Sequence, residues 1–138
     1  MPTRDNVVPA SDGAGEVVAI GSAVHRFKVG DRVSGIFNQG HLSGICDHYA
    51  VTTGLGGLVD GTLRQYGAYS QEGLVKIPSH LNYREGASLT CAAVTAWNAL
   101  YGLAGKRLSP GDWVLTQGTG GVSVFAIQVR FSFSSYFL

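Results

Sequence analysis

The feature that most constrains the fold is a glycine-rich turn near the C-terminal end, set between a strand pattern and a helix pattern. Residues 113–116 read Trp-Val-Leu-Thr, which is typical of a strand, and residues 122–129 form an apolar run typical of a helix. The turn consists of Gly118, Thr119, Gly120, Gly121 and Val122. A strand, a glycine turn and a helix in this order open a dinucleotide-binding domain. The end of the chain is therefore predicted to begin an α/β domain.

The chemistry of such a turn is binding of a pyrophosphate. The first glycine makes a tight bend, the second lets the backbone approach the phosphates, and the first N–H groups of the helix are free to bind them. Ser123 occupies the place of the third glycine and is small enough for close packing. The residue that reads the ribose would lie roughly 20 positions further on, at or past Leu138. We therefore expect only half of a dinucleotide site, and the residues leave NAD and NADP open.

The first half of the chain is rich in glycine and reads as β structure. The expected strands cover residues 16–20, 32–37, 65–70 and 73–77. Residues 53–61 also contain several glycines, but no strand closely precedes them and no helix follows them. We interpret them as a connection and not as a phosphate-binding loop.

A helix is predicted in the middle of the chain. Asn82 and Glu85 have the spacing of a capping box, in which each side chain accepts a hydrogen bond from the other residue's backbone N–H. Apolar residues then recur at three- and four-residue steps as far as Leu103, which indicates one apolar helix face. Gly102 and Gly105 are placed to end the helix.

Composition and charge argue against several classes of partner. The net charge is +1, which provides no basic surface for nucleic acid. The most apolar helical stretch, residues 89–103, is too short to span a bilayer, and the first residues lack an apolar signal region. We therefore expect a cytoplasmic protein with no nucleic-acid or membrane partner. Cys46 and Cys91 are then expected to be reduced thiols, although a role as metal ligands stays open.

Several motifs occur together in a characteristic order. Residues 9–17 read Pro-Ala-Ser-Asp-Gly-Ala-Gly-Glu-Val, and residues 27–33 read Phe-Lys-Val-Gly-Asp-Arg-Val. Residues 91–100 and then Pro-Gly-Asp at 110–112 precede the glycine turn. Together they resemble the medium-chain dehydrogenase/reductase superfamily, most of all its zinc-independent alcohol dehydrogenase-like and quinone oxidoreductase-like members. The resemblance runs from about residue 6 to residue 129.

The resemblance implies a mixed β and α/β fold. An incomplete GroES-like β-barrel catalytic domain is expected at residues 1–80, followed by a connecting helix region at 81–109. Residues 110–138 are expected to hold the first β-α unit of a Rossmann domain that binds NAD(P). The family's strands before the equivalent of Asn6 are missing, so the resemblance predicts a chain truncated at both ends.

The resemblance also implies an activity. Such members reduce a carbonyl, a quinone or an activated alkene by hydride transfer from NAD(P)H, with NADP slightly favoured here over NAD. A small-molecule substrate and a homo-oligomer are the implied partners. Thr95 stands where the family has a threonine against the nicotinamide, and no acid–base residue is identified. The predicted cofactor contacts are Thr95, Gly118, Thr119, Gly120, Gly121 and Val122.

No zinc is expected. The zinc enzymes of the superfamily carry Gly-His-Glu where residues 10–12 read Ala-Ser-Asp, so the imidazole ligand is replaced by a hydroxyl. Cys91 matches a cysteine of the catalytic zinc site, but one thiolate cannot hold a metal that needs three protein ligands. His41, Cys46 and His48 lack regular ligand spacing.

Because half of the dinucleotide site is expected to be absent, this chain is predicted to be inactive or impaired as an enzyme. The alternative is a non-catalytic interaction module that pairs exposed strands with a full-length homologue or with itself. The helix pattern is expected to end near Val129. Residues 130–138, which are rich in Phe and Ser, are interpreted either as an aromatic docking tail or as translated non-coding sequence.

Overall fold

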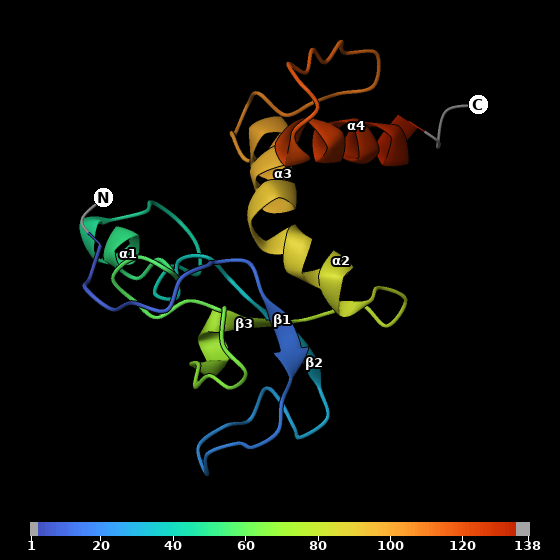
Figure 1. Cartoon of the computed structure of the whole chain (residues 1–138). Coiled ribbons are helices and arrows are strands. Elements are labelled where there is room, and N and C mark those ends of the chain that lie inside the picture. Colours follow the sequence, from blue (N-terminus) through green and yellow to red (C-terminus); the bar gives the residue numbers. More distant parts are fainter. Residues whose placement is uncertain (1–2, 135–138) are drawn as a thin grey trace. The chain divides into compact units, whose positions relative to one another are not determined.

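The computed structural model describes residues 3–134, and Figure 1 labels its elements along the chain. Contacts divide the chain into two compact units, Met1–Thr90 and Cys91–Leu138. Strands β1 to β3 and helices α1 and α2 belong to the first unit, and helices α3 and α4 belong to the second. None of the described helices is long and apolar enough to cross a membrane.

The first unit is built on a small antiparallel sheet. Its strands, in the order β1-β2-β3, are β1 (Ala14–Glu16), β2 (Arg32–Gly35) and β3 (Leu74–Lys76). Val33 of the central strand lies opposite Gly15 on one side and Lys76 on the other. Val33 and Ser34 are buried, and the Ser34 hydroxyl donates a 2.7 Å hydrogen bond to the Gly13 carbonyl. The central strand is therefore held by backbone pairing on both edges and by the Ser34 side-chain hydrogen bond to Gly13, the residue just before β1.

The strands agree only partly with the sequence predictions. The predicted strands at 32–37 and 73–77 are present in shortened form as β2 and β3. Only the start of the strand predicted at 16–20 is formed: β1 ends at Glu16, and the Val17 backbone adds hydrogen bonds to Asp31 and Gly30. The strand predicted at 65–70 is wrong: it finds no partner strand, and a 3₁₀ helix, Gln71–Gly73, follows it. A strand pattern becomes a strand only where a neighbour accepts its backbone bonds.

A short helix that was not predicted from the sequence lies before the glycine-rich connection. Helix α1 (His48–Thr52) is capped by Asp47, whose carboxylate accepts a 2.7 Å hydrogen bond from the Ala50 N–H. Residues 53–61 form a connection of turns and isolated bridges, and a connection is what the sequence predicted. One bridge pairs Gly54 with Asn38. The signal for α1 was the aspartate cap, which favours a helix start.

The predicted capping box is confirmed at the start of helix α2 (Tyr83–Ser88). The Asn82 side chain accepts from the Glu85 N–H at 3.0 Å, and the Glu85 carboxylate accepts from the Asn82 N–H at 2.7 Å. A π-helical segment, Leu89–Ala93, follows, and then helix α3 (Val94–Tyr101). The helix ends near Gly102, one residue before the predicted apolar pattern stops.

The second unit pairs α3 with helix α4 (Gly121–Ser134). Where the structure describes the side chains of these two helices, the buried residues are Ala96 and Ala126. Both are small, which lets helix backbones approach closely. Helix α4 continues through Ser134, so the predicted end near Val129 is wrong. The rest of the tail, residues 135–138, which we interpreted as an aromatic docking tail or as translated non-coding sequence, lies outside the described residues.

The strand predicted at 113–116 is not formed. This segment runs without helix or strand, and no strand of the described part of the chain pairs with it. The Trp113 side chain is 99% exposed and that of Leu115 is 87% exposed. The local sequence favours a strand, but a strand requires a partner, and residues 3–134 provide none.

A carboxylate joins the turn before β2 to β3. Asp31 accepts a 3.0 Å hydrogen bond from the Lys28 N–H and forms a 3.0 Å ion pair with Lys76. Only 12% of its side chain is exposed. The Lys28 amide first, and Lys76 second, hold the pKa of Asp31 below its ordinary value of 3.8.

We expect the contribution of Asp31 to stability to disappear in acid. Because its folded-state pKa is lowered, the contribution is present above about pH 3.8 and is lost as the pH falls through the lowered value. The free energy of unfolding of wild type should exceed that of Asp31→Asn by a constant amount at neutral pH, and by less in acid. Denaturant unfolding at a series of pH values measures this difference. A difference that stays constant or widens below pH 3.8 would contradict the assignment.

Gly61 is required where two backbone segments meet. Its N–H donates to the Val8 carbonyl at 2.7 Å, and the neighbouring Thr62 N–H donates to the Ala10 carbonyl at 2.8 Å. A Cβ on Gly61 would lie 1.9 Å from the Ala10 oxygen and 2.5 Å from the Pro9 oxygen. Both atoms are backbone, so no side-chain rotation relieves the overlap.

Gly61→Ala should therefore destabilise the first unit by roughly 2–3 kcal/mol, the cost of forced overpacking. The matched control is Gly57→Ala, because a Cβ there meets only the Gly54 oxygen at an ordinary 3.6 Å. The control should stay within about 0.5 kcal/mol of wild type. Equal urea midpoints for the two variants would show that the backbone around Gly61 shifts to accommodate a methyl group, which would contradict the prediction.

Candidate functional site

The glycine turn predicted from the sequence lies at the start of helix α4. Gly118 has a positive φ of 80°, a backbone conformation that favours glycine. Two hydrogen bonds fold the turn onto the helix: the Ser123 hydroxyl donates to the Gln117 carbonyl at 2.9 Å, and the Val124 N–H donates to the Gly120 carbonyl at 3.1 Å. The turn is exposed from Gly118 to Val122. Its first helical N–H groups therefore lie at an open end of the helix.

The three glycines of the turn have different surroundings. A Cβ on Gly121 would lie 3.2 Å from the Cβ of Ala92, so this glycine permits close packing inside the second unit. Gly120 has no positive φ, and a Cβ there would meet nothing within 4 Å. The chain itself therefore does not require glycine at 120. The open space beside it leaves room for a group that approaches the backbone from outside.

Thr95, the other predicted cofactor contact, lies exposed on helix α3. The second unit thus contains all the predicted contacts. The turn packs closely against Ala92, which lies three residues before Thr95. A Cβ on Gly121 would meet only the Ala92 side chain within 4 Å.

The residues considered for metal binding are His41, Cys46, His48 and Cys91. Within residues 3–134, no three His, Cys, Asp or Glu side chains gather where they could hold one ion. Cys46 and Cys91 are both exposed thiols, and Asp47 is occupied as the cap of α1. Ala10 has a positive φ of 69°, which suits the glycine that the zinc enzymes carry there in the resemblance drawn above.

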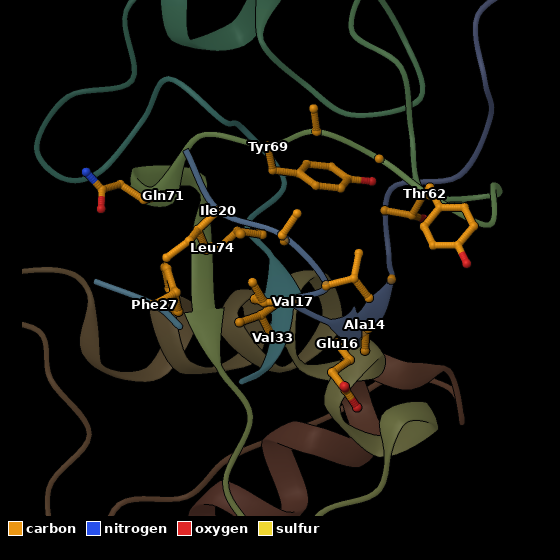
Figure 2. A pocket seen from close by; sticks show the side chains of 18 of the residues that line it. Ala14, Glu16, Val17, Ile20, Phe27, Val33, Thr62, Tyr69, Gln71 and Leu74 are labelled. Carbon is orange, nitrogen blue, oxygen red and sulfur yellow. The ribbon is translucent and has the colours of Figure 1, made fainter. Parts of the chain in front are cut away.

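A hollow that was not predicted from the sequence is present in the structure. It lies in the first unit and has a volume of about 950 Å³. Figure 2 shows Val17, Phe27, Val33 and Leu74 among the apolar side chains that line it, with Tyr69 beside them. No predicted cofactor residue belongs to this lining. Its residues come from three strands, two loops and the 3₁₀ helix, so no contiguous motif could have identified it.

Comparison with known proteins assigns the fold and the family. The alcohol dehydrogenase GroES-like domain family matches residues 1–79. The "Zinc-type alcohol dehydrogenase-like protein C1773.06c" of Schizosaccharomyces pombe is 43% identical over 128 residues, covering 93% of this chain and 37% of its own length. The "Quinone-oxidoreductase homolog, chloroplastic" of Spinacia oleracea is 32% identical, covering 94% of this chain and 35% of its own length.

Solved structures agree with these relatives. A crystal structure described as alcohol dehydrogenase, from Sinorhizobium meliloti 1021, superposes with a TM-score of 0.85 at 38% identity, covering 95% of this chain and 39% of that one. One described as NAD-dependent alcohol dehydrogenase has a TM-score of 0.77 at 30% identity, covering 96% and 40%. This chain therefore spans less than half the length of each of these proteins.

The sequence resemblance and the predicted fold class are confirmed by these matches, and the relatives are oxidoreductases by name. The divisions predicted at residues 80 and 109 stay predictions. The small antiparallel sheet, the capped helix that follows it and the family match over residues 1–79 lead to one conclusion. This chain belongs to the alcohol dehydrogenase GroES-like domain family, within the medium-chain dehydrogenases/reductases.

Proposed function

We propose that this chain carries the first part of the nicotinamide-dinucleotide site of an oxidoreductase. In this proposal the substrate is a carbonyl, a quinone or an activated alkene, and the reaction is hydride transfer without zinc. The observation that carries the proposal is Gly120, a glycine that neither its backbone angle nor its packing requires. A glycine kept free of internal contacts suits a site where a ligand approaches the backbone.

Helix α4 supplies the charge complement for this ligand. Its first backbone N–H groups have no partner within the helix, and the helix dipole places partial positive charge at the same end. Both favour a phosphate group. The hydrogen bond between Ser123 and Gln117 holds the turn folded on the helix, so these N–H groups are positioned before a ligand arrives.

The bound dinucleotide would supply the hydride through its nicotinamide ring. Thr95 is our proposed contact for that ring, because it matches the family's threonine and lies on α3, which packs against α4. The relatives support a nicotinamide cofactor in general, since one neighbour is described as NAD-dependent. We further propose that the site slightly prefers NADP over NAD.

We propose further that this chain by itself turns over little or no substrate. Hydride transfer requires a well-placed cofactor and exclusion of water. Gly118 to Val122 and Thr95 are all exposed to solvent. Binding of the cofactor by the turn and catalysis are therefore separable properties here.

Cofactor binding can be measured by titrating the purified chain with NADPH and with NADH. Energy transfer from Trp97 and Trp113 to the reduced nicotinamide reports binding. We expect saturable binding that Gly120→Ala weakens about tenfold or more, a change of about 1.4 kcal/mol, because the new methyl occupies the space beside the turn. Gly57→Ala, whose Cβ would also meet no close neighbour, should bind as wild type does.

Two results would reject the proposal. One is absence of saturable binding to a chain that circular dichroism shows to be folded. The other is equal affinity of the Gly120→Ala and Gly57→Ala variants. The ratio of NADPH to NADH affinity tests the NADP preference separately.

The zinc-free part of the proposal has its own test. The chain is incubated with excess zinc, dialysed and analysed for metal. We expect well below one zinc per chain, because the described donors form no three-ligand group. Stoichiometric zinc that is lost in a Cys91→Ser variant would show that the cysteine finds further ligands.

A further inference from the structure

Ser123, at the third position of the glycine turn, makes a hydrogen bond that a requirement for small size does not explain. It is the third residue of helix α4 and is half-buried. Its hydroxyl donates at 2.9 Å to the carbonyl of Gln117, six residues earlier and outside the helix. A glycine or an alanine at this position would allow the same close packing but could not make this bond.

This bond differs from the usual one of a helical serine. A serine inside a helix ordinarily donates to the carbonyl three or four residues before it, which for Ser123 would be Gly120 or Thr119. The Gly120 carbonyl instead accepts from the Val124 N–H at 3.1 Å. The Ser123 hydroxyl therefore bridges the whole turn, and we refer to its bond with Gln117 as the turn-closing bond.

The turn is fixed at both of its ends. The turn-closing bond lies across Gly118, which has a φ of 80° and, as a glycine, a backbone with wide conformational freedom. At the other end Gly121 packs against Ala92, since a Cβ on Gly121 would lie 3.2 Å from the Ala92 Cβ. The residues between these two points take their position from them.

We infer that Ser123 is a positioning residue of the dinucleotide site, one that acts through its hydroxyl and not only by being small; this inference rests on the proposed function. A hydroxyl has one proton to donate, and Ser123 donates it to Gln117, so the same proton does not reach a phosphate oxygen. Ser123 therefore acts on the ligand through the backbone. It holds the N–H groups at the start of α4 in place, so that less conformational entropy is lost on binding.

The ligand-free chain provides the first test. Ser123→Ala removes the turn-closing bond but keeps a small side chain, and alanine favours a helix more than serine does, so α4 itself should not be weakened. We expect the NMR order parameters of the Gly118 and Gly120 amides to fall from about 0.8 to below about 0.6. The matched control is Ser109→Ala, which removes a hydroxyl of the same unit that lies 3.5 Å from the Arg107 carbonyl. The control should keep the wild-type values.

The second test is binding of NADH and of ADP-ribose, which contains the pyrophosphate but no nicotinamide. Calorimetric titration should show that Ser123→Ala binds both about fivefold more weakly than wild type, the factor expected for one net hydrogen bond. The factor should be the same for both nucleotides, because the lost order concerns the backbone around the pyrophosphate. Circular dichroism should be unchanged, and Ser109→Ala should bind as wild type does.

Two results would overturn the inference while wild type binds both nucleotides. If Ser123→Ala binds as tightly as wild type, only the size of the third residue matters. If its affinity falls but the order of the ligand-free turn does not, the hydroxyl contacts the ligand directly and is not a positioning group. A folded wild-type chain that binds neither nucleotide rejects the proposed function, and the positioning role with it, whatever the order parameters show.

Discussion

The first unit depends on the pairing of β2 with a neighbour on each side. The strand has four residues, so each backbone hydrogen bond is a large fraction of its stability, and the surrounding contacts extend the ladder at both ends. At its start Asp31 is bound to the Lys28 amide and to Lys76, and beyond its end the Ile36 N–H donates to the Gly73 carbonyl at 2.9 Å. The buried Ser34 hydroxyl adds a bond to Gly13. A sheet this narrow is stabilised by such polar anchors as much as by its apolar core.

The candidate site depends on a different constraint, the close approach of two helical segments through small residues. Ala96 and Ala126 are buried within α3 and α4, and Gly121 leaves room for Ala92. These small side chains fix where the N-terminus of α4 lies in the second unit, while Gly120 stays clear of every neighbour. Gly121, which permits packing, and Gly120, the proposed binding glycine, are thus adjacent in sequence but differ in their surroundings. Substitution at 120 can therefore probe ligand binding without disturbing the fold.

Most local signals were predicted correctly from the sequence, although the Asp47 cap of α1 was missed and the end of α4 was placed too early. Signals that need a distant partner were not predicted. Asn82 and Glu85 cap each other over three residues, so the start of α2 was predictable. The glycine turn and the start of α4 were predictable for the same reason. The strand patterns at 65–70 and 113–116 were misleading, because a strand exists only when another segment accepts its backbone bonds. The hollow lined by Val17, Val33 and Leu74 combines segments far apart in the chain, and no motif marks it.

The segment 113–116 runs directly into the candidate site. It leads to Gln117, whose carbonyl accepts a hydrogen bond from the Ser123 hydroxyl, and to Gly118, whose left-handed backbone begins the turn. This hydrogen bond and this backbone angle fold the turn in the absence of any ligand. A dinucleotide bound at the proposed site would therefore lose little affinity to ordering of the turn, because the backbone N–H groups at the start of α4 are already in place.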